Sequence, residues 1–354
     1  MFLAIRELIH AKVRYILIGL IMVLIACLIF IISGLTQGLS ADNASAIQDL
    51  QADYLLIDPD AELEMTKSFI PQEEKEEVAQ MDEVEEASSL SIRMMNASVN
   101  NSDQNEDVAL FVTESDGMLM PPVSEGRAIN SDNEVVVDDS LKQEGIEIGD
   151  TLTFGEDSEW TIVGFVENQR YSHTSVVFVN GGQAENINAI AIQADETNAE
   201  ALQANVDDSF DMVTKGEALQ GIPSYSQEQG SLNMMTIFLY VIAAFVLAAF
   251  FYVITLQKRD QFGVLKALGA KTAYLVKNLI SQVVLISVLC IAVAVGVTLG
   301  VAALLPADMP FLLTASGMLQ TSLLILMVSI IGAVISLVQV VKIDPIEAIE
   351  GAGK

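Results

Sequence analysis

Cysteine and histidine are scarce in this chain of 354 residues, which holds two of each. Cys27 and Cys290 both lie in hydrophobic runs, so we expect no disulfide to cross-link a soluble domain. No group of ligand-type residues has the spacing of a metal site, and no metal is expected. The loop G-x-x-x-x-G-K-S/T is also missing, which excludes a P-loop nucleotide site. We assign no catalytic residue.

Basic residues are also few, with 17 Lys and Arg against 47 Asp and Glu, a formal net charge of −30. Residues 41–230 hold 41 acidic and 7 basic residues (−34), whereas the remainder holds 6 and 10 (+4). An acidic domain is therefore inserted between weakly basic segments. Phosphate contacts need clustered Lys and Arg, so nucleic acid is excluded as a partner. The carboxylates could keep the surface hydrated in a salty or alkaline habitat, or attract cationic ligands.

Four long hydrophobic runs indicate membrane helices. The first, residues 15–35, carries no charge, and about 20 residues span a hydrocarbon core of about 30 Å. It exceeds the apolar core of a signal peptide, and no A-x-A-like cleavage site follows closely, so we expect an uncleaved helix. Three further runs cover about residues 234–256, 274–305 and 318–341, of which 274–305 is long enough to tilt.

The charges beside these runs predict the orientation. Basic residues precede the first run, and residues 257–277 hold five basic residues against one acidic. Residues 306–314 hold one acidic residue and no Lys or Arg. Because cytoplasmic loops are enriched in Lys and Arg, we expect a multi-pass protein of the cell membrane. Both termini would then be cytoplasmic and the acidic domain extracellular.

The acidic segment alternates strand-like and helix-like stretches. Pro71 stands where a Glu-rich helix over residues 72–81 would begin. Strands are expected at residues 52–58, 90–99, 108–113, 134–137, 160–166, 175–179, 189–193 and 212–214, and a further helix at 196–205. This alternation over about 190 residues favours an α+β or split βαβ domain with a core of its own.

The predicted fold class is an α-helical membrane protein with four transmembrane helices plus an α+β extracytoplasmic domain inserted between helices 1 and 2. The expected segments are a cytoplasmic interfacial helix (1–14), transmembrane helix 1 (15–36), the extracytoplasmic domain (37–230), transmembrane helix 2 (231–256), a cytoplasmic coupling helix (257–273), transmembrane helix 3 (274–305), an external loop (306–317), transmembrane helix 4 (318–341) and a cytoplasmic C-terminus (342–354).

Small residues mark two of the hydrophobic helices. Ser33 and Gly34, with Gly38 just beyond, allow a tight helix contact, which we expect at a dimer seam or a seam facing the domain. Gly296 and Gly300, in G-x-x-x-G spacing, have the same interpretation. None of the central spans holds an ionisable Asp, Glu, Lys or Arg, which disfavours a proton- or ion-coupled transporter.

The stretch QKRDQFGVLKALGAKTAY, residues 257–274, predicts a short amphipathic helix at the cytoplasmic face. Its apolar residues at helical spacing are Phe262, Val264, Leu265 and Leu268. The basic residues expected on the other side are Lys258, Arg259, Lys266 and Lys271. Such a helix could rest on lipid headgroups or dock in a groove of a cytoplasmic partner. Composition leaves both possibilities open.

Several stretches carry a family resemblance. AIRELIHAKVRYIL near the N-terminus, QKRDQFGVLKALGAKTAYLVK, KIDPIEAI near the C-terminus and the segment 125–180 together resemble the MacB/FtsX-like class of ABC transporter permeases. Within that class, ISGLTQGLS, SYSQEQGSLNMM, AFFYVITLQK, MPFLLT and DPIEAIEGA are similar to the HrtB-type subfamily of haem-efflux permeases.

The resemblance implies the permease subunit of an ATP-driven ABC efflux pump that exports haem from the membrane to the outside. The working unit would be a homodimer of this chain in the lipid bilayer with a separate, HrtA-like ABC ATPase that uses the ATP. The chain itself would be no enzyme and would hold no permanent cofactor, with haem as its substrate. The resemblance also favours docking for the cytoplasmic helix. The expected ATPase-docking residues are Phe262, Gly263, Leu265, Lys266, Leu268 and Gly269.

A haem site needs an apolar slot, an axial ligand and cations for the propionates. With His10 and His173 as the only histidines, we expect no bis-histidine site within one chain. Weaker ligation by Tyr, Met or Glu suits a haem that must leave. The candidates are Tyr171, Tyr225, Glu228, Met234 and Met235, with Arg170 for a propionate and His173, Glu64 and Met65 as further candidates. The tyrosines could instead be interface-belt residues, and the methionines packing residues.

Two other functions fit the same sequence. The same fold could export a peptide, an antibiotic or a lipoprotein. It could also be a non-transporting mechanotransmission subunit, whose external domain activates a cell-wall hydrolase or a sensor kinase. A long external coiled coil would favour that second function, and residues 41–230 contain no heptad run.

Overall fold

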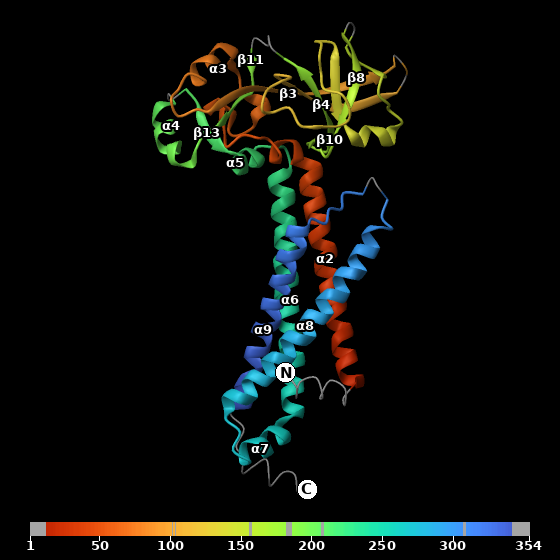
Figure 1. Cartoon of the computed structure of the whole chain (residues 1–354), viewed down its shortest axis with the longest axis vertical. Coiled ribbons are helices and arrows are strands. Elements are labelled where there is room, and N and C mark those ends of the chain that lie inside the picture. The colour runs from red at the N-terminus through yellow and green to blue at the C-terminus, as the bar shows by residue number, and fades with distance from the viewer. Residues whose placement is uncertain are drawn as a thin grey trace. The chain divides into compact units, whose positions relative to one another are not determined.

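The computed structural model describes residues 12–341, apart from 101, 103, 156–157, 182–185, 207–208 and 307–308. The chain divides into two compact units, a helical bundle (Met1–Gln37 and Ser231–Lys354) and an inserted domain (Gly38–Gly230). Figure 1 shows the elements of both units in chain order. Of the expected cytoplasmic segments 1–14 and 342–354, residues 1–11 and 342–354 lie outside the described residues.

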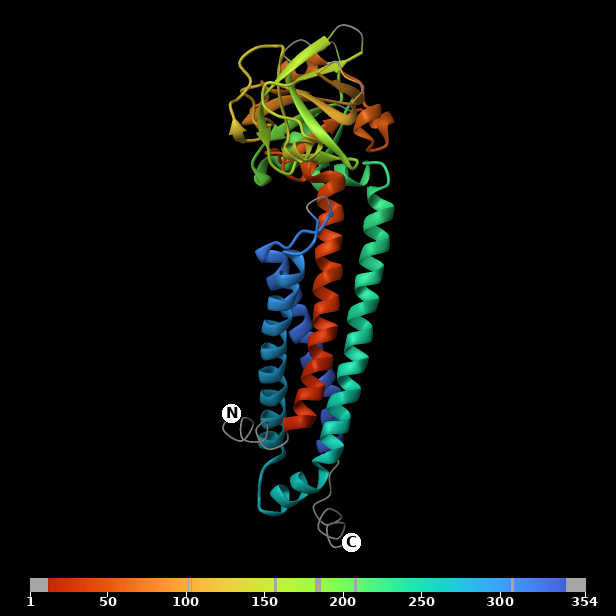
Figure 2. The same ribbon diagram turned by 90° about the vertical axis from the view of Figure 1, so that its right-hand side faces the viewer.

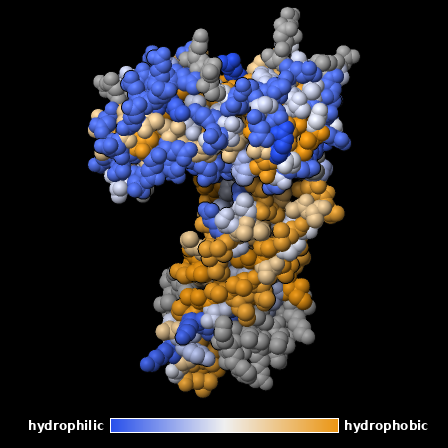
Figure 3. All heavy atoms as spheres, turned by 45° about the horizontal axis from the view of Figure 1, so that its top comes forward, coloured by the Kyte–Doolittle hydropathy of each residue, from blue (hydrophilic) through white to orange (hydrophobic). Residues whose placement is uncertain are grey.

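Four long helices form the bundle, and all four are apolar and long enough to cross a membrane. They are α2 (Lys12–Gln48), α6 (Tyr225–Gln257), α8 (Thr272–Ala302) and α9 (Ala315–Val341), with the short α7 (Arg259–Ala267) between α6 and α8. Figures 1 and 2 show these long helices side by side. Their outer surfaces expose large apolar side chains such as Leu24, Phe245 and Val293, and Figure 3 shows hydrophobic residues over them. Such a surface suits lipid, because its side chains are apolar and the backbone N–H and C=O groups are hydrogen-bonded within each helix.

The small-residue seam on α2 packs against the bundle of its own chain. A Cβ atom added at Gly34 would lie 2.7 Å from the ring of Phe311, and Ser33 Oγ is 3.2 Å from Thr321 Oγ1. The expectation that Ser33 and Gly34 face a dimer partner or the domain was therefore wrong. Gly296 and Gly300 on α8 differ, because a Cβ atom added at either would meet nothing within 4 Å.

The inserted domain is built on one large mixed sheet with strand order β13-β1-β12-β3-β4-β10-β6-β8-β5, while β7 pairs with β3 and β8, and β9 with β10. The pairs β4–β10 and β6–β8 are parallel, and the other pairs in this sheet are antiparallel. The strands are β1 (Tyr54–Ile57), β3 (Glu86–Val99), β4 (Asn105–Thr113), β5 (Val123–Gly126), β6 (Glu134–Asp138), β7 (Thr151–Phe154), β8 (Ser158–Val166), β9 (Arg170–Tyr171), β10 (Thr174–Asn180), β12 (Ala189–Gln193) and β13 (Asp211–Thr214).

A small separate sheet pairs β2 (Ile70–Pro71) with β11 (Asn186–Ile187). The helices of the domain are α3 (Gln72–Val78), α4 (Ala199–Asn205) and α5 (Lys215–Gln220). α5 begins with a capping box, in which Thr214 and Glu217 satisfy each other's backbone N–H groups.

Alternation along the strands separates two hydrophobic cores. On β4, Phe111 belongs to one core and Leu110 to the other, because successive side chains point to opposite faces of a sheet. The first core also takes in Ile47 and Leu50, at and just beyond the end of α2, and Tyr225 at the start of α6. The domain therefore buries the ends of both helices.

The predicted fold class is confirmed, with four long apolar helices and an inserted domain of strands and helices. Two details differ from the sequence expectations. α2 continues to Gln48, beyond the expected end of transmembrane helix 1 at residue 36, and α6 begins at Tyr225 within a stretch assigned to the domain. Part of each extension is buried in the domain, including Asn43 and Ser45 of α2 and Tyr225 of α6.

Candidate functional site

A polar cluster in the inserted domain joins the end of α2, the start of α6 and the turn between β9 and β10. That turn has two residues, Ser172 and His173, because Tyr171 pairs with Thr174 across it. Both residues have positive φ (50° and 64°), which matches the twist of a type I′ hairpin but costs energy without glycine. The backbone N–H of Ser172 donates to the Asn43 carbonyl of α2 at 2.7 Å. The turn thereby points His173 at the two helices.

His173 lies between two carboxylates. Its Nδ1 is 2.7 Å from Asp42 Oδ2, and because a carboxylate accepts, Nδ1 carries the proton. Its Nε2 is 3.2 Å from Asn43 Nδ2 and 3.3 Å from the Glu228 carboxylate. Asn43 Nδ2 also donates to Glu228 Oε2 at 3.0 Å. A neutral ring can therefore accept from Asn43, and a protonated ring can donate to both Asp42 and Glu228.

These contacts decide the protonation of His173. Burial alone would lower the pKa of His173, but the hydrogen bonds to Asp42 and Glu228 and their negative charges outweigh that effect. The pKa of His173 therefore lies above its ordinary value. When protonated, the imidazolium bridges α2 and α6.

Arg170 completes the cluster on the other side of Asp42. Its Nε donates to Asp42 Oδ1 at 3.0 Å, and its Nη2 donates to the His173 carbonyl at 2.7 Å. Its Nη1 donates to Ser140 Oγ at 2.9 Å and to Ser175 Oγ at 2.7 Å. Arg170 was expected to meet a haem propionate, and here the guanidinium is already bound within the domain.

The two candidate tyrosines are covered by protein. Tyr171 is 1% exposed, and its ring packs edge-on against Phe111 at a centroid distance of 5.5 Å. Burial raises the pKa of Tyr171, followed by a smaller effect of Glu64. Tyr225 is also buried, and its hydroxyl lies 3.1 Å from Ser40 Oγ on α2. Arg170 and His173 thus contact the end of α2 or the start of α6, and Tyr225 and Glu228 belong to the start of α6.

The remaining candidates lie apart. Met65 is buried in the core of the domain, while Glu64 forms an ion pair with Lys67. Met234 (58% exposed) and Met235 lie on α6 within the helical bundle, and both are exposed. A haem reaching them would meet thioether sulfur, which can ligate iron.

A second candidate surface is α7, the predicted coupling helix. Phe262 is 3% exposed and packs with Leu275 and Leu279 of α8, so it holds α7 to the bundle. Gly263 is buried, and Leu265 and Lys266 are half-buried. Leu268, the C-cap of α7, is 80% exposed, and Gly269 follows with φ +95°, a backbone conformation that suits glycine. Val264 is exposed as well, so Leu268 and Val264 are the apolar side chains that point outward from this segment.

Lys258 lies at the junction of α6 and α7, with 2% of its surface exposed. Its Nζ donates to Gln282 Oε1 of α8 at 2.9 Å and lies 5.8 Å from the ring centroid of Tyr15 on α2. The expectation that Lys258 belongs to the outward basic face was wrong. Position 258 is the N-cap of α7, where the chain turns back toward α8, so its side chain points into the bundle.

Comparisons with known proteins place the chain in a family. A family profile described as the FtsX-like permease C-terminal domain matches residues 233–345. Over 354 residues, 99% of both chains, the sequence is 33% identical to HrtB of Staphylococcus haemolyticus (strain JCSC1435), named as the permease protein of a candidate hemin transport system. The chain belongs to the HrtB-type ABC transporter permeases.

Two further proteins are similar to this chain. A permease of the same name from Staphylococcus epidermidis (strain ATCC 12228 / FDA PCI 1200) is 29% identical to this HrtB-type permease over 99% of both chains. The solved periplasmic region of MacB from Actinobacillus actinomycetemcomitans aligns with 50% of this permease and 97% of its own chain, at 12% identity and a TM-score of 0.38.

Sequence reasoning missed several residues of both clusters in this HrtB-type permease. Asp42, Asn43, Ser140 and Ser175 are spread over more than 130 positions and have no common spacing. Lys258 carried one usable signal, its place directly after the apolar run of α6. Its partner Gln282 stands ten residues into α8 and had no signal at all.

Proposed function

We propose that this chain is the membrane subunit of an ATP-driven pump that exports haem from the membrane to the outside of the cell. The observation that carries the proposal is the 33% identity over 99% of both chains to HrtB of a hemin transport system. The positive charge of residues 257–277 supports an orientation with both termini in the cytoplasm and the inserted domain outside.

The ATP would be hydrolysed on a separate, HrtA-like ABC ATPase, since this chain has no P-loop. Two copies of the permease would work with that ATPase, and α7 would be its docking element. Leu268 and Val264 offer exposed apolar anchors four residues apart, the spacing used when a helix enters a groove. Phe262 and Gly263 are buried and would lie on the side of α7 that packs against the bundle. Leu265, Lys266 and Gly269 would lie at the edge of the interface with the ATPase.

Leu268→Asp tests the docking role. The side chain is mostly exposed, so the charge should leave the bundle folded while it prevents insertion into an apolar groove. We expect at least a tenfold loss of ATPase in co-purification, with normal membrane insertion. Lys271→Met, an exposed position just beyond, is the control. A complete complex with Leu268→Asp would contradict docking through this residue.

For the substrate, the exposed thioethers of Met234 and Met235 are the proposed contacts on α6. A haem dissolved in the membrane can reach an exposed helix face, and thioether ligation is weak enough to permit release. Tyr171, Tyr225 and Arg170 would act indirectly, by holding the helix ends in the domain. Glu228 would do the same through His173 and Asn43.

The polar cluster around His173 would transmit movement from the ATPase to the extracellular domain. α2 and α6 are continuous helices, and Asp42 near the end of α2 and Glu228 in the first turn of α6 both contact His173 of the β9–β10 turn. A movement of α7 would reach α6 directly, because one residue separates them. Switching a two-state site from 1:99 to 99:1 requires about 5.5 kcal/mol, which is the scale that the ATPase must supply.

The decisive experiment is transport in vesicles that contain this permease and its ATPase. Haem loaded into the membrane should pass to an external apoprotein acceptor only when ATP is present. Met234→Ala/Met235→Ala should lower that transfer and the Soret absorbance of the purified protein, while ATP hydrolysis continues. ATP hydrolysis without haem transfer by the wild type would contradict export. In cells, deletion should sensitise growth to haem and not to cationic peptides.

A further inference from the structure

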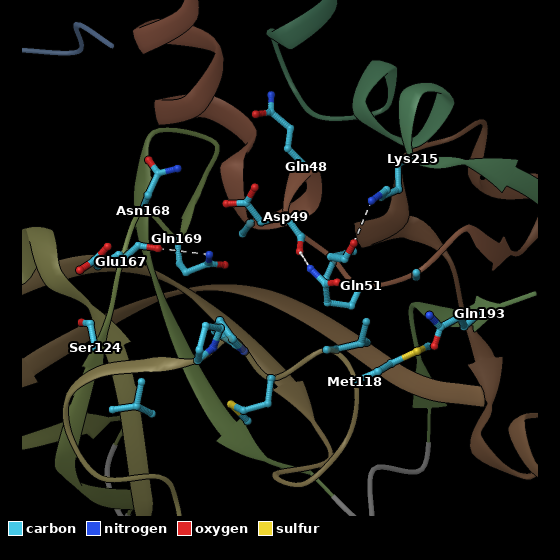
Figure 4. Close-up of a pocket in the computed structure, with 18 of the residues that line it drawn as sticks. Gln48, Asp49, Gln51, Met118, Ser124, Glu167, Asn168, Gln169, Gln193 and Lys215 are labelled. Atoms are coloured by element: carbon cyan, nitrogen blue, oxygen red, sulfur yellow. Dashed lines mark hydrogen bonds between the residues drawn. The ribbon is translucent and has the colours of Figure 1, made fainter. Parts of the chain in front are cut away.

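The inserted domain contains a cavity of about 720 Å³ that the His173 cluster does not use. Residues at and after the end of α2, from Ala46 to Asp53, lie along one side of it, and residues 118–124, which lead into and begin β5, lie along the other (Figure 4). The turn 167–169 before β9 closes one end, and Gln193 and Lys215 lie at the opposite end. Its volume falls in the range of about 300–1,000 Å³ that holds small molecules.

One wall of the cavity is apolar. Met118, Leu119 and Met120 line it, followed by Pro121 and Pro122. Leu119 is buried, and the two methionines are partly buried against the core of the domain, so the wall has firm support. Unbranched thioether side chains adapt to irregular ligands, and the two prolines restrict the loop that presents them.

The rim opposite this wall is acidic. Asp49, Asp53 and Glu167 line the cavity and are exposed, against the single ammonium group of Lys215. Lys215 Nζ donates to the Leu50 carbonyl at 2.9 Å, so the ammonium group is held by the backbone just beyond the end of α2 (Figure 4). Burial raises the pKa of Asp49, an effect that the charge of Lys215 and a hydrogen bond from Asn168 oppose. A positively charged ligand would therefore be attracted to the carboxylates of this rim.

We propose that this cavity binds a small amphipathic cation, with its apolar body against the Met118–Pro121 wall and its nitrogen cation at the rim of Asp49, Asp53 and Glu167. The charge of −34 over residues 41–230 would raise the local concentration of such a ligand. Haem carries two carboxylates and would meet charges of its own sign here. The proposal therefore concerns a second ligand and does not depend on haem export.

Binding can be measured with the full chain in nanodiscs of phosphatidylcholine. The probe is rhodamine 6G, a fluorescent amphipathic cation, and its anisotropy is compared with that in empty nanodiscs. We expect saturable binding above the lipid background that weakens in 0.5 M salt, because rim charges are screened. Sulforhodamine B has a similar ring system but carries sulfonates, and it should neither bind nor compete.

Two variants locate the site. Asp53→Asn/Glu167→Gln removes two rim charges while keeping hydrogen-bond acceptors, and we expect about a tenfold weaker affinity. Gln51→Trp places a large ring into the cavity from an exposed position and should abolish binding. Glu76→Gln/Glu77→Gln, on the exposed side of α3, removes the same charge outside the cavity and should change affinity less than twofold.

Unchanged melting temperatures would show that all variants fold. Loss of binding in both cavity variants, with the α3 control intact, would support the site. The proposal fails if rhodamine 6G binds both cavity variants as tightly as the wild type. Equal binding of sulforhodamine B would also overturn it, because the rim would then have no preference for cations.

Discussion

Arg170 in the inserted domain and Lys258 in the helical bundle each bind other polar side chains. Arg170 pairs with the Asp42 carboxylate and donates to two hydroxyls and a carbonyl. Lys258 donates to the neutral amide of Gln282 and faces the ring of Tyr15. An ionic network leaves charged partners behind when one member is removed, whereas a neutral partner loses only a hydrogen bond. The two clusters should therefore respond differently to the same substitution.

The largest effect is expected for Arg170→Met. Asp42 would lose its guanidinium partner, and Ser140 and Ser175 would each lose a donor. Because the side chain is only partly exposed, we expect a loss of about 2–3 kcal/mol in the free energy of unfolding of the domain. Urea unfolding of the detergent-solubilised chain measures it. Arg127→Met is the control, since its pair with Glu134 is at the surface and should change the unfolding midpoint little.

Lys258→Met should have a smaller effect on stability, about 1 kcal/mol, because Met fills the same space and only the contacts of the ammonium group are lost. Its effect on transport should be larger, since Lys258 holds the junction of α6 and α7 to α8. We expect ATP hydrolysis to continue with a several-fold lower ratio of haem exported to ATP consumed. Lys271→Met, which is exposed, should keep the normal ratio. An unchanged ratio with Lys258→Met would remove this residue from the coupling route.

The inserted domain should also show a pH dependence. The groups facing His173 are Asp42 and Asn43 of α2, Arg170 of β9 and Glu228 of α6. Because the pKa of His173 is raised, its stabilisation is complete below the unfolded value of about 6.5 and disappears as pH rises through the higher folded value. We expect the melting temperature to fall by a few degrees between pH 6 and pH 9. His173→Gln should flatten this change, and an equal slope in both proteins would exclude His173 as its source.

The smallest effect on folding is expected for Gly300→Leu on α8. A side chain added there would meet nothing within 4 Å in its own chain, so the bundle should remain intact. If Gly296 and Gly300 face the second copy of the proposed homodimer, the larger residue should weaken that contact. Chemical cross-linking in membranes measures the dimer fraction. Gly34→Leu, which would clash with Phe311, should instead destabilise the monomer.

Much of the fold could be predicted because lipid and water impose strong patterns on a sequence. Uncharged runs of helix length mark α2, α6, α8 and α9, and short apolar stretches mark strands such as β4 and β10. The ends of α2 and α6 could not be predicted, since their polar residues resemble a linker. Part of each end is buried in the domain, including Asn43, Ser45 and Tyr225.

The candidate sites were predictable only in part. Arg170, His173, Tyr225 and Glu228 were chosen as substrate contacts. The structure joins Arg170, His173 and Glu228 with Asp42 and Asn43, and it pairs Tyr225 with Ser40. The residue types were informative because ionisable groups near a helix end need partners. Their contacts with one another could not be inferred, because the partners come from three distant segments. The same reason hid the pairing of Lys258 with Gln282.

By itself the sequence determined the membrane helices, the acidic inserted domain and the lack of a P-loop nucleotide site in this chain. These follow from hydropathy, charge and a missing loop, which are properties of continuous stretches. The tertiary structure decided which side of α7 is free, with Phe262 inside and Leu268 outside, and which basic residues are buried. Burial depends on what other segments place against a side chain, and periodicity along one helix does not contain that information.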